Sequence, residues 1–503
     1  MNGERPDDRR LVAACLLGSY DGTEVPEWLL EHVRGGLGGV LLFAQNVVDD
    51  AQVAATCARL REARADVLVA IDEEGGDVTR LDAATGSDTP APAAFGFVDD
   101  VELTRGAFAD LGRRVHALGI DLTLAPCADI NSNPKNPVIG LRSFGSEAEG
   151  VARHVVAAIE GFRAGGVAVC AKHYPGHGDT STDTHREPAR VDGSLDALVQ
   201  RELVPFAAAV RAGTDAVLTA HVVAPALDEE PVSLSARWTQ QLRESTGFHG
   251  SVITDALDMD AVAQGRGIDG VADAAVRALV AGADLLCLGS NFDAAMTDAV
   301  IDRVVDALGR AEIERGALAA SAARNAALRR EACHSPQPVS NPCAAAIVAR
   351  AAVVVDGDLP AGPFAVLECR PRGGSASFNV SWGVAAELER LGWTTRRIGE
   401  ADDVAASCRS FVEAAGRAPI LVVVRDLEVH PWQRTVVAAV REAADQPVVV
   451  AEMGWPSQDQ PEGVGMVVTH GAARSSGRAL LDRLTGGATP AASGTWTSDM
   501  EES

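Results

Sequence analysis

The chain has 503 residues, of which 47% are hydrophobic and 4% aromatic, a composition typical of a soluble globular protein with room for two or three domains. Its 44 basic and 70 acidic residues give a formal net charge of -26, which disfavours nucleic-acid and anionic-membrane partners. Nine cysteines occur without a CxxC pair, so we interpret them as reduced core residues. No run approaches the roughly 20 apolar residues that span a bilayer, and no cleavable leader is recognisable. The sequence therefore predicts a cytoplasmic protein.

Short apolar runs alternate with longer segments of helical spacing through the first 330 residues, and this alternation is typical of βα units. The number and spacing of the runs predict a (β/α)8 TIM barrel over residues 1–330, an α/β fold with a parallel sheet. A doubly wound sheet is the alternative. The expected strands are residues 11–18, 38–43, 67–72, 120–126, 167–173, 215–221, 251–256 and 283–289.

Polar side chains occur at the ends of five successive expected strands. A titratable group at the end of an apolar strand needs a partner, because burying it unpaired is costly. In a TIM barrel the strand ends meet at one face, where the loops carry the chemistry. The pattern therefore predicts one shared polar site. Its strand-end members are Asp72, Asp129, Lys172 with His173, His221 and Asp255.

The remainder of the chain predicts a second, smaller domain. Residues 331–342 have the proline and polar content of a linker. Residues 343–485 again alternate apolar runs with helical segments, which predicts an α/β sandwich domain with a mostly parallel sheet. They contain no phosphate-binding glycine fingerprint, so we assign them no chemistry of their own. Residues 486–503 have the composition of a flexible tail.

The stretch AKHYPGHGDTSTDTH, residues 171–185, concentrates titratable groups and holds one of only two lysines in the chain. Its histidines and aspartates are the residue types that bind metal ions. However, Pro175, Gly176 and Gly178 prevent the helix that an HxxxH zinc site requires. A hydrolase triad is disfavoured as well, because no GxSxG elbow accompanies the histidines. We expect no metal and no organic cofactor, and a metal site formed by the loop itself is the alternative.

Glycoside chemistry suits the strand-end residues better. It needs a carboxylate at the anomeric carbon and a proton donor for the departing oxygen. Asp255, after the apolar run SVIT, is a candidate nucleophile on a rigid element. His185 is a candidate donor because histidine titrates near neutrality, and Asp183 can hydrogen-bond its ring.

The same residues carry a resemblance to a known family. KHYPGHGDTSTDTH resembles the KHFPGHGxTxxDSH signature of the β-N-acetylglucosaminidases of glycoside hydrolase family 3. AIDEEGGDVTRL resembles IDQEGGRVxRL, DINSNPKNPVIGLRSFG resembles DxNxNPxNPVIGxRSFG, LTAHVVAPALD resembles MTAHVxxPxLD, and VITDALDM resembles the SDDLxM nucleophile block. The matching blocks occur in the family's order across the expected barrel.

The resemblance implies a role for each matched residue. Asp255 would form a covalent glycosyl-enzyme, and His185 with Asp183 would be the acid/base pair. The sugar hydroxyls would be held by charge-assisted hydrogen bonds from Asp72, Arg80, Arg142, Lys172 and His173. Asp129 and His221 would support them, while His177 and Asp179 would shape the loop.

Two positions depart from the family's pattern. Glu73 replaces a glutamine, and Asp77 replaces an arginine. From these two changes we expect a more acidic rim near Arg80, which would disfavour an anionic leaving group.

Three functions remain open on the sequence. The first is retaining exo-hydrolysis of a terminal β-linked N-acetylglucosamine, a small carbohydrate substrate, without a nucleic-acid or membrane partner. The second is phosphorolysis, in which inorganic phosphate resolves the same intermediate, because a histidine base does not repel phosphate. The third is a non-catalytic carbohydrate-binding barrel. We favour the β-N-acetylhexosaminidase.

Overall fold

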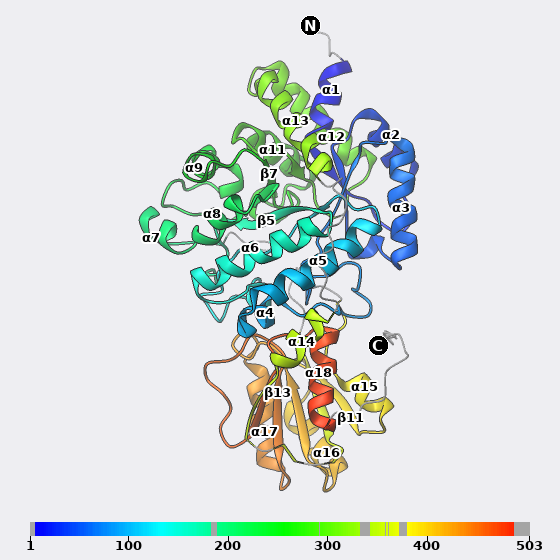
Figure 1. Ribbon diagram of the computed structural model, residues 1–503, viewed down its shortest axis with the longest axis vertical. Helices are drawn as coiled ribbons and strands as arrows, with labels where there is room; N and C mark the ends of the chain where they lie inside the picture. Colours follow the sequence, from blue (N-terminus) through cyan, green and yellow to red (C-terminus); the bar gives the residue numbers. More distant parts are fainter. Residues whose placement is uncertain are drawn as a thin grey trace.

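The computed structural model describes residues 6–182, 189–290, 292–331, 343–357, 359–360, 362–371 and 380–486. It has two parts, a larger barrel and a smaller sheet domain, which follow one another along the chain (Figure 1). Apart from Glu331 and Gly486, the predicted linker and the predicted tail lie outside the described residues.

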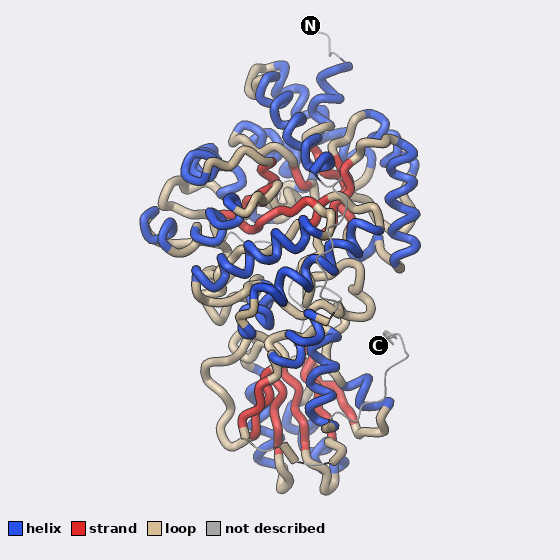
Figure 2. The backbone as a smooth tube through the Cα atoms, in the orientation of Figure 1, coloured by secondary structure: helices blue, strands red, loops and turns tan. Residues whose placement is uncertain are grey.

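An eight-stranded parallel sheet forms the centre of the first part (Figure 2). The order β7-β6-β5-β4-β3-β2-β1-β8 follows the sequence around the sheet. A parallel bridge between Ile253, in β7, and Leu285, the residue before β8, joins the two ends of this order. The prediction of a TIM barrel is therefore confirmed. The strands are β1 (Leu16–Gly18), β2 (Gly39–Leu42), β3 (Leu68–Ile71), β4 (Leu122–Thr123), β5 (Ala168–Tyr174), β6 (Ala216–Thr219), β7 (Ser251–Thr254) and β8 (Leu286–Cys287).

The first expected strand is only partly a strand. Residues 11–13 of the apolar run LVAACLLG complete α1 (Pro6–Ala13), whose first turn carries Asp7 and Asp8, and β1 begins at Leu16. Acidic side chains near a helix N-terminus interact favourably with its dipole. A short apolar run without internal turn residues does not by itself distinguish a helix end from a strand.

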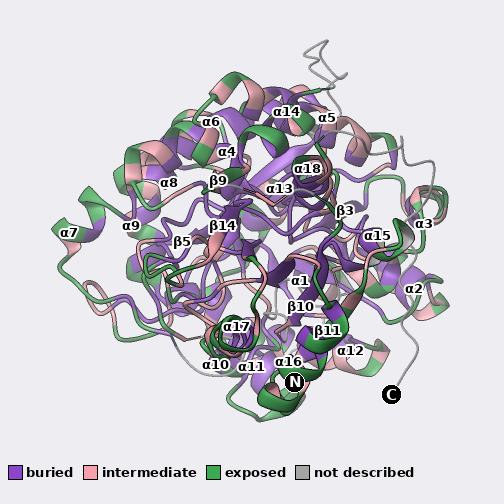
Figure 3. Cartoon of the chain, turned by 90° about the horizontal axis from the view of Figure 1, so that it is seen from below, coloured by how far each residue is buried: buried purple, intermediate pink, exposed green. Residues whose placement is uncertain are grey.

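Helices surround the sheet on the outside, and exposed residues lie on their outer sides (Figure 3). Side chains at the helix starts accept backbone N–H groups that have no partner within the helix. Asp49, Asp100 and Ser235 do so for α3, α5 and α9. The helices of this part are α1, α2 (Glu27–Gly35), α3 (Asp50–Ala63), α4 (Pro92–Val98), α5 (Val101–Ala117), α6 (Ala148–Ala164), α7 (Leu195–Gln200), α8 (Val204–Arg211), α9 (Ala236–Thr246), α10 (Asp260–Ala263), α11 (Gly267–Val280), α12 (Ala294–Gly309) and α13 (Arg315–Glu331), with short 3-10 turns η1 (Ala44–Asn46), η2 (Gly140–Arg142) and η3 (Val232–Leu234).

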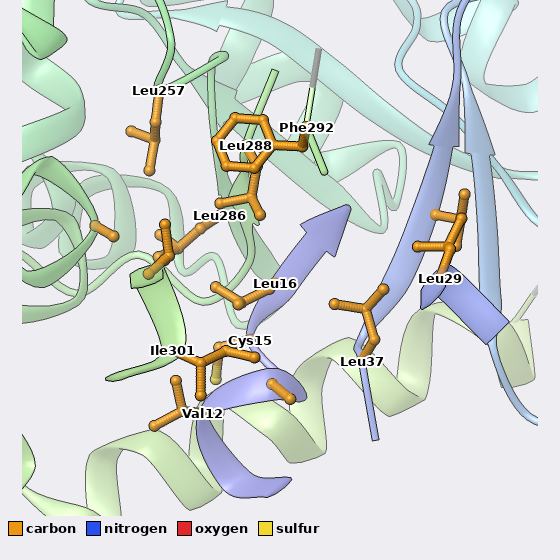
Figure 4. Packing of buried hydrophobic residues seen from close by; sticks show 14 of the residues in the cluster. Val12, Cys15, Leu16, Leu29, Leu37, Leu257, Leu286, Leu288, Phe292 and Ile301 are labelled. Atoms are coloured by element: carbon orange, nitrogen blue, oxygen red, sulfur yellow. The ribbon is translucent and has the colours of Figure 1, made fainter. Parts of the chain in front are cut away.

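Apolar side chains cover both faces of the barrel strands, the inner face and the face toward the helices. Leu17, Leu41, Leu122, Leu218 and Ile253 belong to a cluster contributed by strands all around the sheet. The alternate strand positions pack outward against the helices, and Figure 4 shows part of that outer cluster around β1 and β8. Burial on both faces explains why these strands read as continuous apolar runs in the sequence.

The second part is a six-stranded sheet in the order β11-β10-β12-β13-β14-β9. All pairings are parallel except that of β9 with β14, so the predicted mostly parallel sheet is confirmed. Strand β11 does not form an apolar run in the sequence, because its residues TRRIG are charged and half-exposed at the sheet edge. The elements are α14 (Ala344–Ala351), β9 (Val354–Asp356), β10 (Ala365–Arg370), α15 (Ala385–Arg390), β11 (Thr395–Gly399), α16 (Val404–Ala415), β12 (Ile420–Val424), α17 (Trp432–Ala443), β13 (Val448–Glu452), β14 (Gly465–Val468) and α18 (Arg474–Thr485).

The second domain contacts the barrel mainly at α4, α5 and the loop after β3. Helix α14 packs against α4, α5 and α18. The backbone N–H of Ser381 donates to Ala83 at 2.9 Å, and Arg474 pairs with Asp88. The loops after the barrel strands therefore face the second domain. Among the described helices, none is long and apolar enough to cross a membrane.

The packing between α4 and the loop before α6 leads to a stability prediction. A Cβ on Gly96 would lie 1.5 Å from the carbonyl oxygen of Phe144, whereas a Cβ on Gly150, in α6, would meet nothing within 4 Å. Gly96→Ala should therefore lower the free energy of unfolding by about 1–3 kcal/mol or more, while Gly150→Ala should raise it by roughly 0.5 kcal/mol. Urea denaturation of the two variants checks this, and equal stabilities would contradict the close contact.

Candidate active site

Six of the eight predicted site residues lie in the described part of the chain. Asp72 follows β3, Lys172 and His173 are in β5, and Asp255 follows β7. Arg80 and Arg142 come from the loops after β3 and β4. The structure thus places all six on the edge of the barrel where its strands end. Asp183 and His185 lie outside the described residues.

The Lys172 ammonium lies between two carboxylates. Its Nζ is 2.6 Å from Oδ1 of Asp72 and 2.6 Å from Oε1 of Glu74. Burial alone would lower the pKa of Lys172, but these two carboxylates raise it above its ordinary value. Burial would likewise raise the pKa of Asp72, which Lys172 and Arg80 hold below its usual range. Lys172 and Asp72 are therefore both charged at neutral pH.

Glu74 also binds the guanidinium of Arg142 in a two-pronged pair. Nε of Arg142 donates to Oε2 at 2.9 Å and Nη2 donates to Oε1 at 2.7 Å. Only 1% of Glu74 and 7% of Arg142 is exposed. Burial would raise the pKa of Glu74, but Arg142 and Lys172 hold it far below its ordinary value. Sequence reasoning gave Glu74 no role, although three cations, Arg80, Arg142 and Lys172, were predicted for the site and buried cations need carboxylate partners.

His173 is oriented by a buried carboxylate on one side. Its Nδ1 is 2.6 Å from Oδ2 of Asp129, and its Nε2 is 3.1 Å from Nη2 of Arg142. Burial raises the pKa of Asp129, but His173 more than reverses this and brings it to about 2. Since Nη2 of Arg142 is a donor, the Nε2 atom accepts and the proton resides on Nδ1. Asp129 therefore has the supporting position predicted for it.

Asp129, His173 and Cys127 also form a group whose ligand-type atoms lie within 4.8 Å of one another. These atoms already bind each other, because the Cys127 thiol donates to Asp129 at 3.1 Å. Burial and the Asp129 charge raise the pKa of Cys127 well above its ordinary value, which disfavours the thiolate that a metal needs. The described geometry is that of a hydrogen-bonded support for His173.

The first part of the loop after β5 is held by hydrogen bonds from two other segments of the chain, at Asn136 and Arg201. The side-chain amide of Asn136 donates to the carbonyls of His177 and Thr180, at 2.8 and 3.0 Å. On the other side, Arg201 donates to Asp179 at 2.5 Å. His177 and Asp179 thus have the loop-shaping contacts expected of them. Thr180, the last of these attached residues, precedes Asp183 by three positions in the sequence.

Asp255 stands at the end of β7 with its backbone in the sheet. Its N–H donates to Thr219 at 3.0 Å, and its Oδ1 accepts the N–H of Ala256 at 2.9 Å. His221 supports the same turn, because its Nε2 is 2.9 Å from the carbonyl of Ala256. Burial raises the pKa of Cys287, and the charges of Asp255, Asp258 and Asp72 raise it further. The carboxylates that follow β3 and β7 therefore influence the same thiol.

The expectation of an acidic rim is wrong for both positions that departed from the family's pattern. Glu73 is fully buried and its Oε2 accepts the N–H groups of Arg80 and Leu81, at 2.9 and 3.1 Å. Asp77 is paired at 3.1 Å with Arg425 of the second domain. The buried Glu73 carboxylate thus holds the loop after β3 by two backbone hydrogen bonds. The charge of Asp77 is neutralised by an arginine of the second domain. The sequence did not show this because Arg425 is about 350 residues away.

Comparisons with known proteins identify the family to which the barrel is similar. The family model described as glycosyl hydrolase family 3 N terminal domain matches residues 18–328. Beta-hexosaminidase from Xylella fastidiosa (strain M23) is 37% identical over 278 residues, which are 54% of this chain and 81% of that protein. Beta-hexosaminidase A from Pseudoalteromonas piscicida is 32% identical over 336 residues, 61% of this chain and 56% of that protein, so the match spans little more than half of that relative.

The fold comparison covers both domains. A solved structure of a glycoside hydrolase family 3 beta-N-acetylglucosaminidase from Paenibacillus sp. str. FPU-7 superposes with a TM-score of 0.85 at 29% identity. The superposition covers 95% of this chain and 96% of that one. The second domain is therefore part of the shared architecture.

The two adjacent glutamates should differ in how much the same substitution costs. Glu74→Gln leaves Lys172 and Arg142 with one buried negative charge fewer, which should cost about 3–5 kcal/mol of unfolding free energy. In Glu73→Gln an amide oxygen can still accept the two backbone N–H groups, so its stability at pH 5 should change little. Chemical denaturation of both variants checks the assignment. A tolerated Glu74→Gln would contradict it.

Glu73 also predicts a pH dependence. Burial, followed by the Asp82 charge, raises the pKa of Glu73 from 4.5 to about 7. Between these values the folded state binds more protons than the unfolded state, so this group's contribution to stability is lost as pH rises. Relative to the wild type, Glu73→Gln should therefore gain stability from pH 4.5 to pH 7, by at most about 3 kcal/mol. Parallel denaturation curves at both pH values test this, and an unchanged difference would refute it.

Proposed function

The chain belongs to glycosyl hydrolase family 3 and is a glycoside hydrolase, and we propose that it is a retaining exo-β-N-acetylglucosaminidase. The observation that carries this proposal is the buried array in which Asp72, Glu74, Lys172, Arg142 and His173 bind one another beside Asp255. Such an array presents fixed donors and acceptors to the hydroxyls of one terminal sugar.

Preorganisation is what this array contributes to the reaction. Each cation is already paired and held by hydrogen bonds of 2.6–3.1 Å. Binding a sugar therefore requires little reorganisation of the protein. Donors fixed in advance can bind the distorted sugar of the transition state more strongly than the relaxed substrate.

In the proposed reaction the Asp255 carboxylate attacks the anomeric carbon and forms a covalent glycosyl-enzyme. His185, oriented by Asp183, gives a proton to the departing oxygen. Water then attacks the anomeric carbon, His185 takes its proton, and the Asp255 carboxylate leaves. The two displacements restore the original anomeric configuration. The attachments of Asn136 and Arg201 support this scheme, because they hold the chain that leads to the dyad.

Phosphorolysis would use the same first step and differ only in the second. The relatives reported above carry hydrolase names, so we retain hydrolysis and make phosphorolysis an outcome of the test. A non-catalytic barrel has no support, since the relatives named above carry enzyme names. The substrate class we propose is a carbohydrate ending in β-linked N-acetylglucosamine.

Removing the proposed nucleophile should abolish turnover without unfolding the protein. Asp255 is half-buried and its side chain accepts one local N–H, so Asp255→Ala should remain folded while the rate on a 4-nitrophenyl N-acetylglucosaminide falls by roughly 1,000-fold or more. Asp260→Ala, an exposed carboxylate in the first turn of α10, is the matched control and should keep its rate. An active Asp255→Ala protein would overturn the mechanism.

The acceptor is decided by product analysis with the wild-type protein. If the protein is a hydrolase, its rate should be the same with and without inorganic phosphate. The product should be free N-acetylglucosamine in both cases. A sugar 1-phosphate formed in phosphate buffer would show instead that phosphate resolves the intermediate.

A further inference from the structure

Glu202 is a buried carboxyl that the proposed reaction does not use. It lies between α7 and α8, only 1% of it is exposed, and its side chain packs against the loop after β5 at Gly176. We propose that Glu202 is a positioning residue of the terminal-sugar site: by supporting the turn from His173 to His177, it fixes the imidazole of His173. This inference rests on the proposed function, in which His173 binds the terminal sugar.

The turn from His173 to His177 folds around the Asp129 carboxylate. The N–H of Gly176 donates to the carbonyl of His173 at 2.8 Å, and the N–H of His177 donates to Oδ1 of Asp129 at 2.7 Å. Oδ2 of Asp129 binds Nδ1 of His173 at 2.6 Å. Because the two oxygens belong to one carboxylate, a shift of the turn also changes the hydrogen bond that orients the His173 ring.

This turn is packed closely against two other segments of the chain. Gly176 has a φ of +123°, and a Cβ added to it would lie 2.9 Å from Oε2 and 3.1 Å from Cβ of Glu202. A Cβ on Gly178, two residues further on, would lie 1.8 Å from the carbonyl oxygen of Ile130, in the loop after β4. The turn fits only because both positions are glycine. The Glu202 side chain therefore forms one of the two surfaces that hold it.

The charged groups around Glu202 come from three segments. Nε of Arg201 donates to Oε1 of Glu202 at 2.7 Å, while Nη2 of Arg201 donates to Asp179 at 2.5 Å, so one guanidinium serves two carboxyls. Among the described residues, none hydrogen-bonds Oε2 of Glu202. The charge of the buried Asp129 also acts on this carboxyl, and Asp129 is itself bound by His173 and His177. An ionised Glu202 therefore has less than one full counter-charge.

The protonation state of Glu202 decides whether its side chain can stay in this position. Burial raises the pKa of Glu202 to about 7; Arg201 opposes this shift, and the charges of Asp129 and Asp179 add to it. Below that pH the carboxyl is neutral, and an unpaired neutral hydroxyl costs far less to bury than an unpaired charge. Above it the carboxylate is stabilised by water, which it reaches only by leaving its contact with Gly176. The affinity for the sugar should therefore fall as pH rises through about 7.

The test measures the Kd of N-acetylglucosamine by calorimetry at pH 6 and pH 8. Binding is compared rather than turnover, so that proton transfer by His185 during the reaction does not enter the result. If the sugar binds only the protein with a neutral Glu202, the apparent Kd rises as that fraction falls, and the wild type should bind about 10-fold more weakly at pH 8 than at pH 6. Glu202→Gln keeps the shape without the charge, and its Kd at pH 8 should stay within about 2-fold of its own value at pH 6.

Two further variants separate the charge from the packing. Asp196→Asn changes an exposed carboxylate of α7, and as the matched control it should keep the pH dependence of the wild type. Glu202→Ala removes the contact with Gly176 as well as the charge, so it should bind the sugar more weakly than Glu202→Gln at both pH values. If Glu202→Ala does not fold, the comparison of Glu202→Gln with the wild type still decides the question.

Each other outcome has a definite meaning. A wild-type affinity that is equal at pH 6 and pH 8, or a Glu202→Gln protein with the pH dependence of the wild type, would overturn the role of Glu202 and leave the proposed function intact. Equal losses in Glu202→Gln and Glu202→Ala at both pH values would overturn it too, because only a structural role would remain. A wild-type protein that binds N-acetylglucosamine with the expected pH dependence but cleaves no aryl glycoside would contradict the proposed function alone. A protein that neither binds nor cleaves would contradict both.

Discussion

The site depends on one buried carboxylate, Glu74, which is bound at once by Lys172 and Arg142. Each cation would be costly to bury alone, and in the proposed function each also faces the sugar. Glu74 neutralises part of the charge of both cations, and Asp72 forms a second ion pair with Lys172. Once these four groups are arranged, Arg142 contacts His173. The positions of β3, β5 and the β4 loop are thereby connected through a single hydrogen-bonded array.

The second domain takes part in the same arrangement through Asp77 and Arg425. A carboxylate at position 77 would make the loop after β3 acidic if it stood alone. Paired with Arg425, it instead becomes a contact that holds the second domain over the loop. The charge of Asp77 is thereby compensated by a guanidinium that the second domain supplies.

Several features could be predicted from the sequence because they depend on local patterns. Buried parallel strands give continuous apolar runs, so seven of the eight barrel strands were expected near their observed positions, and polar residues at strand ends indicated one site. Residues 11–13 were misassigned because an apolar helix end and a strand look alike over three residues. Strand β11 was missed because its exposed positions are charged. Glu73 and Asp77 were placed on an acidic rim because their burial and partners are not local properties.

The sequence by itself determined the (β/α)8 barrel, the second mostly parallel sheet and the identity of most residues at the strand ends, since these follow from periodicity and motif spacing. Only the tertiary structure decided which charges meet. Glu74 was assigned no role until Lys172 and Arg142 were placed around it, and Arg425 became a neighbour of Asp77 only when the two domains packed together. The physical reason is that the stability of a buried charge depends on the groups within a few ångströms of it, and folding brings those groups together from distant parts of the chain.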